Sequence, residues 1–218
     1  MANYYDPTLL RNPVAFFMGN QLSSLDYTPH FDFVNLTLNG QYQGIYQLGE
    51  KIKISKDRVN AGDDGFLLEI DAKYSPDDVI FWCKKLQAPI NIKEPDVEEG
   101  DDNYYYVNSF VTTAENVLLS DYFTDENTGY QQFFDIDSFV DKVKTRFNFY
   151  FDNRETIYKY IDSEAECIRE FIVDENKLWG LLCPPDSEKD VVLASYHKEV
   201  EKLKDWLKHR FQWLNDNL

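Results

Sequence analysis

The dipeptide Asn39-Gly40 separates two segments of equal length, 31–38 and 41–48, in which apolar side chains recur. Asn and Gly both tolerate the positive φ angles of a two-residue type I′ turn, so this pair is the strongest short-range signal for a β-hairpin. We therefore predict two antiparallel strands here. Every fold considered for this chain must contain that pair.

Shorter segments rich in β-branched and aromatic residues follow the hairpin. Residues 66–70, 79–83 and 89–92 are predicted to be strands, and the turn 60–65, rich in Gly, Asn and Asp, precedes the first of them. The acidic stretch 93–103 is predicted to be a loop, since its carboxylates lack the ordered spacing of a calcium-binding EF-hand.

The remaining segments have the periodicity of helices. An opening helix is expected, with Asp6 as its cap and Pro7 in its first turn, and Pro13 is expected to begin a second helix. Residues 106–119, a segment beginning at Asp137 or Ser138, 163–179 and 193–214 are predicted to be helices. The third of these begins with the capping-box pattern of Ser163 and Glu166.

These elements predict an α+β fold, a small antiparallel sheet followed by a helical half. We expect one domain over residues 1–218, in which 1–103 is mainly strands with an opening helix and 104–218 is mainly helices. No change of composition along the chain is sharp enough to indicate a linker.

The chain is strongly acidic. Its 218 residues include 39 Asp and Glu against 22 Lys and Arg, a net charge of −17. Such a surface repels phosphate groups, so we expect no nucleic acid partner and no general attraction to anionic membranes. No apolar run approaches the roughly 20 residues of a membrane span, so no membrane insertion is expected. The opening residues indicate no signal peptide, and the cellular location is left open.

Cysteine and histidine offer no metal site. Cys83, Cys167 and Cys183 are too scattered for a zinc motif and are expected to be buried or half-buried free thiols. We therefore predict neither a metal ligand set nor a disulfide framework.

Two pairs of acids are the remaining candidates for chemistry. Glu69 and Asp71 lie two residues apart at the end of a predicted strand and so share a face, which suits either a phosphate or metal contact or an ordinary ion pair. Asp135 and Asp137 suit either a metal or acid–base pair or a helix cap.

Two other clusters have a functional and a structural interpretation. The basic residues between Lys51 and Arg58 either meet a phosphate or acidic partner or balance neighbouring acids. The run Tyr104–Tyr106 is either a sugar-stacking platform or, as we favour, core packing.

Several segments together resemble the CotH kinase-like family, the relatives of spore coat protein H. They are ANYYDPTLLRN (2–12), LNGQYQGIY with LGEKIK (38–53), KDRVN (56–60), GFLLEID (65–71), IKEPD (92–96), FDIDSFV (134–140) and EVEKLKDWLKHRFQWL (199–214). The hairpin segment is the most specific of these. The resemblance implies a reduced protein-kinase-like fold and a family that transfers phosphate from ATP to Ser residues of coat proteins.

The departures from the family pattern concern the catalytic parts. The family's basic, glycine-containing strands that cover the nucleotide phosphates have no counterpart here. After FDIDSF the family also has an NxD catalytic segment and a GPxWDxD metal-binding segment, whereas here residues 138–142 lead directly into 143–146, which resembles a later family helix. Phosphoryl transfer depends on positioning and metal ions. The resemblance therefore implies no catalytic residue and no required cofactor.

We expect a non-catalytic CotH-like binding or scaffold module, with a protein partner at a coat or cell surface. The alternatives are a residual ATP-dependent Ser phosphotransferase that uses the acids named above, and a relic without function. If half of the family's nucleotide pocket survives, it binds ATP with Mg or Mn, and the resemblance places Glu50 and Lys51 near its edge. The terminal helices are then expected to pack directly on the small sheet.

Overall fold

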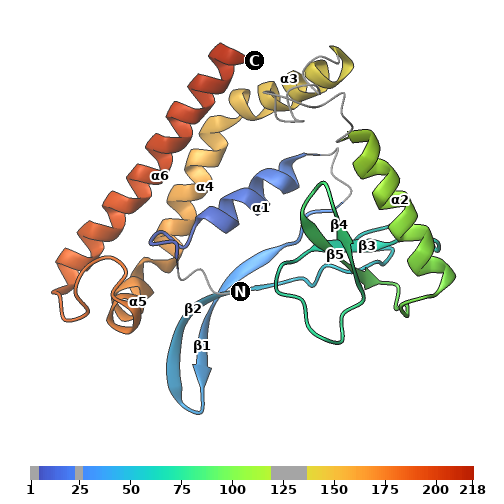
Figure 1. The fold of residues 1–218 in the computed structure, drawn as a ribbon. Helices are drawn as coiled ribbons and strands as arrows, with labels where there is room; N and C mark the ends of the chain where they lie inside the picture. The colour runs from blue at the N-terminus through green and yellow to red at the C-terminus, as the bar shows by residue number, and fades with distance from the viewer. Residues whose placement is uncertain (1–4, 23–26, 119–136) are drawn as a thin grey trace. The chain divides into compact units, whose positions relative to one another are not determined.

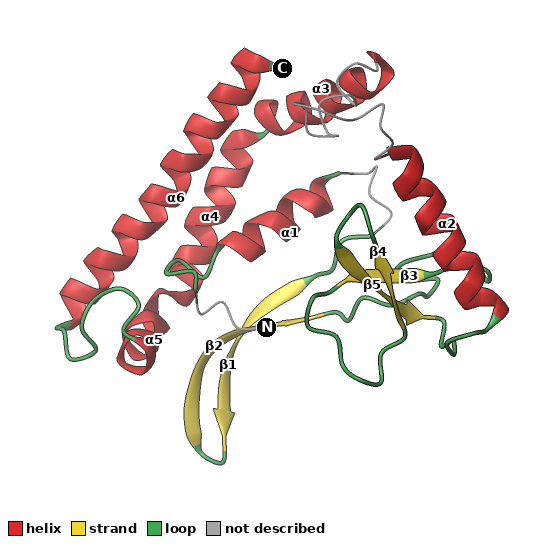
Figure 2. Cartoon of the chain, in the orientation of Figure 1, coloured by secondary structure: helices red, strands yellow, loops and turns green. Residues whose placement is uncertain are grey.

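The computed structural model describes residues 5–22, 27–118 and 137–218 (Figure 1). It combines small antiparallel sheets with several helices, so the fold is α+β, as the sequence predicts (Figure 2). The chain divides into two compact units, one formed by Met1–Lys51 with Lys144–Leu218 and the other by Ile52–Val143. Each unit has its own hydrophobic core.

The predicted hairpin opens the first unit. Strands β1 (Phe31–Leu38) and β2 (Gln41–Gly49) pair antiparallel, and Leu38 faces Gln41 across the turn. Asn39 and Gly40 have φ angles of 51° and 79°, the left-handed values that the turn requires. The hairpin prediction is therefore confirmed, including the residues that make the turn.

Helices supply the rest of the first unit: α1 (Arg11–Gln21), α4 (Arg154–Ile168), the short 3₁₀ turn η3 (Arg169–Phe171), α5 (Ile172–Trp179) and α6 (Lys189–Asn217). Helix α4 lies between α1 and α6 and packs against both (Figure 1). Helix α5 packs against β2, and Ile45 of that strand joins the helical core. Of the terminal helices, α5 thus packs on the hairpin, while α6 packs on α5 and α4.

Helix α3 (Asp137–Asp152) precedes α4 and is continuous across residue 143, where the two units meet in the sequence. Its start agrees with the predicted start at Asp137 or Ser138. The hydroxyl of Tyr150 on this helix donates a hydrogen bond to the backbone oxygen of Met18 at 2.8 Å. This bond ties α3 to α1.

The start of the chain differs from the prediction. Residues 7–10 form turns, and a single helix begins at Arg11 rather than at Pro7 or Pro13. The side chain of Asp6 still satisfies the first helical amide, because its Oδ2 accepts the backbone N–H of Arg11 at 2.8 Å, while its Oδ1 accepts that of Thr8 in the preceding turn at 3.0 Å. Asp6 therefore acts on the first turn of α1 from outside the helix.

The predicted helix start at Ser163 is wrong. Ser163 lies inside α4, which begins at Arg154. The buried side chains of Ile157, Ile161 and Ile168 form an apolar stripe along this helix, and its burial outweighs the local capping pattern. The predicted helix 163–179 is also not continuous, because α4 ends at Ile168 and η3 separates it from α5. Only the predicted end is right: α5 ends at Trp179, and Gly180 follows it with a φ of 59° in the left-handed region.

The second unit is a three-stranded antiparallel sheet covered by one helix. Strands β3 (Leu67–Ile70), β4 (Ile80–Cys83) and β5 (Ala88–Glu94) lie in the order β3-β5-β4, and α2 (Asp102–Leu118) packs against β4. The predicted strands are confirmed. The predicted acidic loop is shorter than 93–103, because β5 continues to Glu94 and α2 begins at Asp102.

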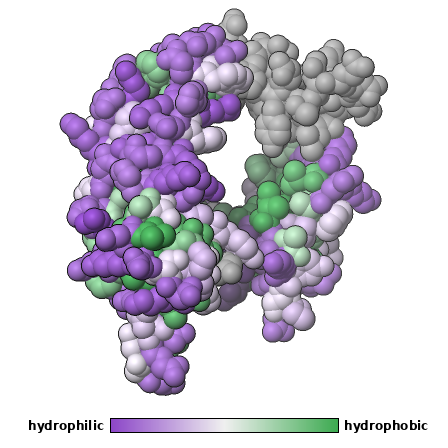
Figure 3. Space-filling view, turned by 90° about the vertical axis from the view of Figure 1, so that its left-hand side faces the viewer, coloured by the Kyte–Doolittle hydropathy of each residue, from purple (hydrophilic) through white to green (hydrophobic). Residues whose placement is uncertain are grey.

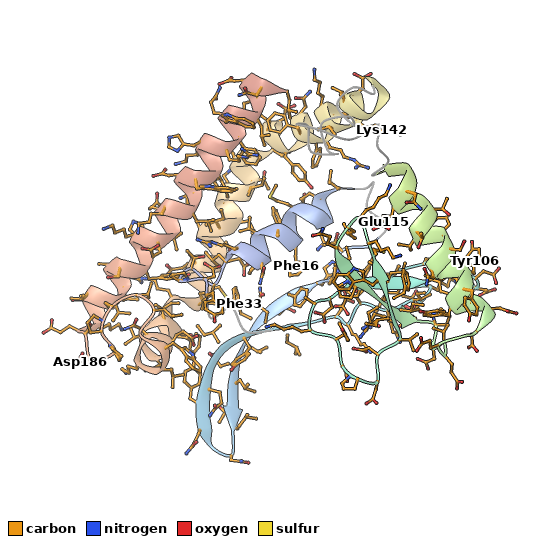
Figure 4. All side chains as sticks on the ribbon, in the orientation of Figure 1. Phe16, Phe33, Tyr106, Glu115, Lys142 and Asp186 are labelled. Carbon is orange, nitrogen blue, oxygen red and sulfur yellow. The ribbon has the colours of Figure 1, made fainter. Side chains whose placement is uncertain are left out.

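Glu115, labelled on α2 in Figure 4, fixes the turn between β4 and β5. Its Oε1 accepts the backbone N–H groups of Lys85 and Leu86, both at 2.7 Å. The side chain of Glu115 is buried, whereas the two residues that donate to it are exposed. One carboxylate therefore ties the hairpin turn to the helix that covers the sheet.

Candidate functional site

A cavity of about 710 Å³ lies in the first unit between α1 and α6. Its lining residues come from these helices alone: Arg11, Val14, Ala15, Met18, Glu199, Lys202, Leu203, Trp206 and Leu207. Small-molecule sites typically enclose roughly 300–1,000 Å³ and are lined mainly by apolar side chains with a few polar groups. This cavity has both properties and is the candidate functional site.

The lining follows from helical periodicity. On α1 it takes positions 11, 14, 15 and 18, and on α6 positions 199, 202, 203, 206 and 207. Residues spaced by three or four lie on one face of a helix. Each helix therefore presents one continuous face to the cavity.

The rest of the first unit holds these two helices apart. Helix α4 packs against both. Near the start of α1, the hydroxyl of Tyr196 on α6 donates to the backbone oxygen of Thr8 at 3.1 Å. Burial, followed by the nearby carboxylates of Asp6 and Glu164, raises the pKa of Tyr196. The bond ties α6 to the turn that precedes α1.

The charged groups of the lining lie at its rim. Arg11 places its Nε 3.6 Å from Oδ1 of Asp6, and its side chain remains 65% exposed. Lys202 places its Nζ 2.5 Å from Oε1 of Glu199. The lining thus carries two cations and one anion in a chain whose net charge is −17. Figure 3 shows that hydrophilic residues dominate one face of this acidic molecule.

The first predicted pair, Glu50 and Lys51, lies after β2 and outside the cavity lining. Glu50 Oε2 accepts the backbone N–H of His30 at 3.0 Å and the hydroxyl of Tyr27 at 3.1 Å. The hydrogen bond from the His30 backbone, followed by that from its ring, lowers the pKa of Glu50. Glu50 therefore closes the open end of the hairpin, and Lys51 beside it is exposed.

The second predicted pair belongs to the other unit. Glu69 of β3 forms an ion pair with Lys93 of β5, with 3.6 Å between Oε2 and Nζ. Asp71 follows the strand, and its Oδ1 accepts the backbone N–H of Lys73 at 2.7 Å. The ordinary interpretation of this pair, a strand-terminal ion pair, describes Glu69. The structure brings neither acid to the cavity.

The other candidates divide between core, surface and the undescribed part of the chain. Tyr104 is buried in the core of the second unit, whereas Tyr105 and Tyr106 are each 61% exposed, so the core interpretation holds for the first alone. Asp135 and the side chain of Asp137 lie outside the described residues.

The cysteines are free, although Cys167 is exposed rather than buried. In the described parts of the chain, no group of three or more His, Cys, Asp and Glu residues is arranged to hold a metal ion. Over the same residues, no helix is both long and apolar enough to cross a membrane.

Sequence reasoning missed the cavity. Val14, Met18, Leu203 and Leu207 belong to or pack against the core of the first unit and also line the cavity. The available signal was the presence of Arg11, Lys202 and Trp206 at positions in phase with those apolar stripes, where a fully buried face would carry none of them.

The chain belongs to the CotH kinase family. The family model, described as CotH kinase protein, matches residues 1–143. Neither the curated proteins nor the solved structures include a significant match to this chain. The family match ends inside α3.

Proposed function

We propose that this protein is a non-catalytic CotH-like binding module, associated with a coat or cell surface. The observation that carries the proposal is the continuity of α3, which runs from Asp137 to Asp152 without a loop. The family resemblance expects the NxD and GPxWDxD segments after residue 138, and the family match ends at residue 143. A continuous helix at this junction supports the loss of both segments.

Two of the four acids that could replace the lost groups already have structural partners. Glu69 pairs with Lys93, and Asp71 accepts a backbone N–H from Lys73. Catalytic carboxylates of a phosphotransferase must instead hold metal ions or orient the acceptor hydroxyl. The contacts of Glu69 and Asp71 favour a role in the sheet.

A phosphate-transfer assay tests the proposal. Purified protein is incubated with radiolabelled ATP, Mg²⁺ or Mn²⁺, and a Ser-containing coat-like peptide, beside an active CotH kinase as positive control. We expect incorporation no greater than in the sample without protein. Transfer that is abolished by Glu69→Gln or Asp71→Asn would overturn the proposal in favour of a residual kinase.

Nucleotide binding is measured separately from transfer. A ligand that binds only the native state at about 100 times its dissociation constant adds roughly 2.7 kcal/mol to the free energy of unfolding. A rise in Tm that requires both ATP and metal, and that Glu50→Gln or Lys51→Gln diminishes, would support a surviving nucleotide pocket. We expect no such rise for a module that no longer performs phosphate transfer.

The proposal also states that the module binds a protein partner at a coat or cell surface, and the cavity between α1 and α6 is the candidate site for this binding. Affinity purification from surface or coat extracts, with the wild type compared against Trp206→Ala, tests the partner. Trp206 lines the cavity and is 62% exposed, so its truncation alters the site with little expected change in folding. The Trp213→Ala variant, an exposed position of the same helix outside the cavity lining, serves as the control.

A further inference from the structure

We propose that the outer edge of β1 is a docking site for an extended segment of a protein partner, which adds a third strand to the hairpin and carries a basic side chain. This edge is separate from the cavity between α1 and α6. The inference therefore goes beyond the proposed function, and it holds whether or not that cavity binds a protein.

The register of the hairpin shows which backbone groups of β1 face outward. The N–H of Glu50 donates to the carbonyl oxygen of His30 at 3.2 Å, so these two residues form a hydrogen-bonded pair. Such pairs alternate with non-hydrogen-bonded pairs along an antiparallel ladder. The backbone groups of Phe31, Phe33 and Asn35 therefore point away from β2. In the described part of the chain, these groups have no hydrogen-bond partner and no further strand lies beside β1.

The two edges of the hairpin differ. Ile45 is the residue of β2 opposite Asn35, and its outward N–H is held by Oε2 of Glu175 at 2.7 Å. Helix α5 also packs against β2, whereas β2 is the only described element that packs extensively against β1. The turn end of the hairpin reaches beyond the helices of the first unit (Figure 2). A carboxylate and a helix thus occupy one edge of the hairpin, and within the first unit the other edge is open.

The sequence of β1 carries little that would prevent strand addition. Natural edge strands are commonly protected by Lys, Pro, bulges or inward-pointing charges. Residues 31–38 contain no Lys, Arg, Pro or Gly, and Asp32 is their only charge. The register shift of the hairpin falls after Leu36, so residues 31–35 pair regularly. Addition of an extended peptide to such an edge gives affinity through backbone hydrogen bonds and specificity through side chains.

Two carboxylates favour a basic side chain on the added segment. Asp32 is exposed and Glu164 on α4 is half-buried. Burial, followed by the charge of Asp32, raises the pKa of Glu164, so the two groups lie close enough to repel each other. Neither carboxylate takes part in an ion pair within the described residues. A Lys or Arg on the added strand is attracted to both. The net charge of −17 disfavours a second copy of this chain as the occupant.

An NMR titration of the full chain tests the inference, with the end-capped peptide TVTKTVT as the probe. We expect saturable shifts and slower hydrogen exchange at the backbone amides of Phe33 and Asn35, because the added strand accepts their hydrogen bonds. The peptide TVTETVT, with Glu in place of Lys, should bind up to about fivefold more weakly, which is the range of an exposed ion pair. Asp32→Asn should reduce this difference, and the exposed control Asp186→Asn should preserve it.

Substitution of Asn35 separates the role of the backbone from that of the side chain. Asn35→Pro removes the outward N–H, and proline is tolerated in an edge strand where the N–H faces away from the ladder. Asn35→Thr is the matched control. Both variants lose the side-chain oxygen that accepts the hydroxyl of Tyr42 at 3.2 Å, but only the Thr variant keeps the backbone N–H. We expect Asn35→Pro to bind TVTKTVT about tenfold more weakly and Asn35→Thr to bind it as the wild type does.

Four results would overturn the inference. They are the absence of saturable shifts, equal binding of TVTKTVT by the two Asn35 variants, equal binding of the two peptides by the wild type, and self-association without peptide that Asn35→Pro abolishes. If Asn35→Pro does not fold, a TVTKTVT peptide methylated at every backbone nitrogen replaces it, because such a peptide cannot donate to β1. Undiminished binding of that peptide would equally overturn the inference. The phosphate-transfer assay and the Trp206→Ala comparison do not involve β1, so the two proposals fail separately.

Discussion

The Oε2 atom of Glu175 on α5 accepts a hydrogen bond from the backbone N–H of Ile45 on β2 at 2.7 Å. Glu175 is 7% exposed, and Ile45 belongs to the helical core. The bond joins residues 130 positions apart in the sequence. The carboxylate therefore fastens the hairpin to α5, close to the register shift of β2 between Tyr42 and Gly44.

Replacement of Glu175 by Gln should reduce the pH dependence of stability. Burial raises the pKa of Glu175 above its usual value, with the Ile45 hydrogen bond acting in the opposite direction. The folded state thus holds this proton more tightly than the unfolded state does, so its stabilising effect is complete below the unfolded pKa and is lost as pH rises through the folded pKa. A Gln amide is neutral, and its oxygen can still accept the Ile45 N–H.

Urea unfolding at pH 4.5 and pH 7.5 checks this prediction. We expect Glu175→Gln to gain stability relative to the wild type on going from the lower to the higher pH. The exposed Glu170→Gln change is the matched control and should show no comparable gain. A difference between Glu175→Gln and the wild type that is the same at both pH values would contradict the assigned role.

Gly44→Ala should destabilise the protein through two effects. Gly44 has a φ of 112°, which L side chains rarely adopt, and an added Cβ would lie 2.7 Å from Oε2 of Glu175 and 3.1 Å from Nε1 of Trp179. Strain of this kind typically costs about 1–3 kcal/mol. Gly40→Ala is the control, because Gly40 has a φ of 79° and no atom within 4 Å of an added Cβ. Equal shifts in the urea midpoint would show that the crowding at Glu175 has no effect.

Asp6→Ala should weaken the start of α1. Asp6 Oδ1 accepts the hydroxyl of Thr8 at 2.7 Å, and Oδ2 accepts the backbone N–H of Arg11 at 2.8 Å. Loss of such a capping side chain typically costs about 1–2 kcal/mol. The exposed Asp186, labelled in Figure 4, provides the control substitution Asp186→Ala. In thermal unfolding, the Tm of Asp6→Ala should lie several degrees below that of both the control and the wild type. An unchanged Tm would refute the capping role.

The sequence predicted the elements whose determinants are local. Asn39 and Gly40 specify the hairpin because the turn needs only their own φ angles. The capping pattern at Ser163 gave a wrong helix start because the burial of Ile157 and Ile161, a tertiary effect, continues the helix through it. The cavity combines Arg11 with Lys202, and only the packing of both helices on α4 brings positions so far apart in the chain to one site.

Glu115→Ala should loosen the turn between β4 and β5. The substitution leaves the backbone N–H groups of Lys85 and Leu86 without the carboxylate that accepts both at 2.7 Å. A buried donor left unsatisfied costs about 1–3 kcal/mol, although water can reach this turn once the side chain is gone and so reduce the loss. Amide hydrogen exchange should therefore accelerate at residues 85 and 86 more than at Ile90 in the centre of the sheet. The exposed Glu99→Ala change is the control, and uniform acceleration across β5 would instead indicate that Glu115 supports the whole second unit.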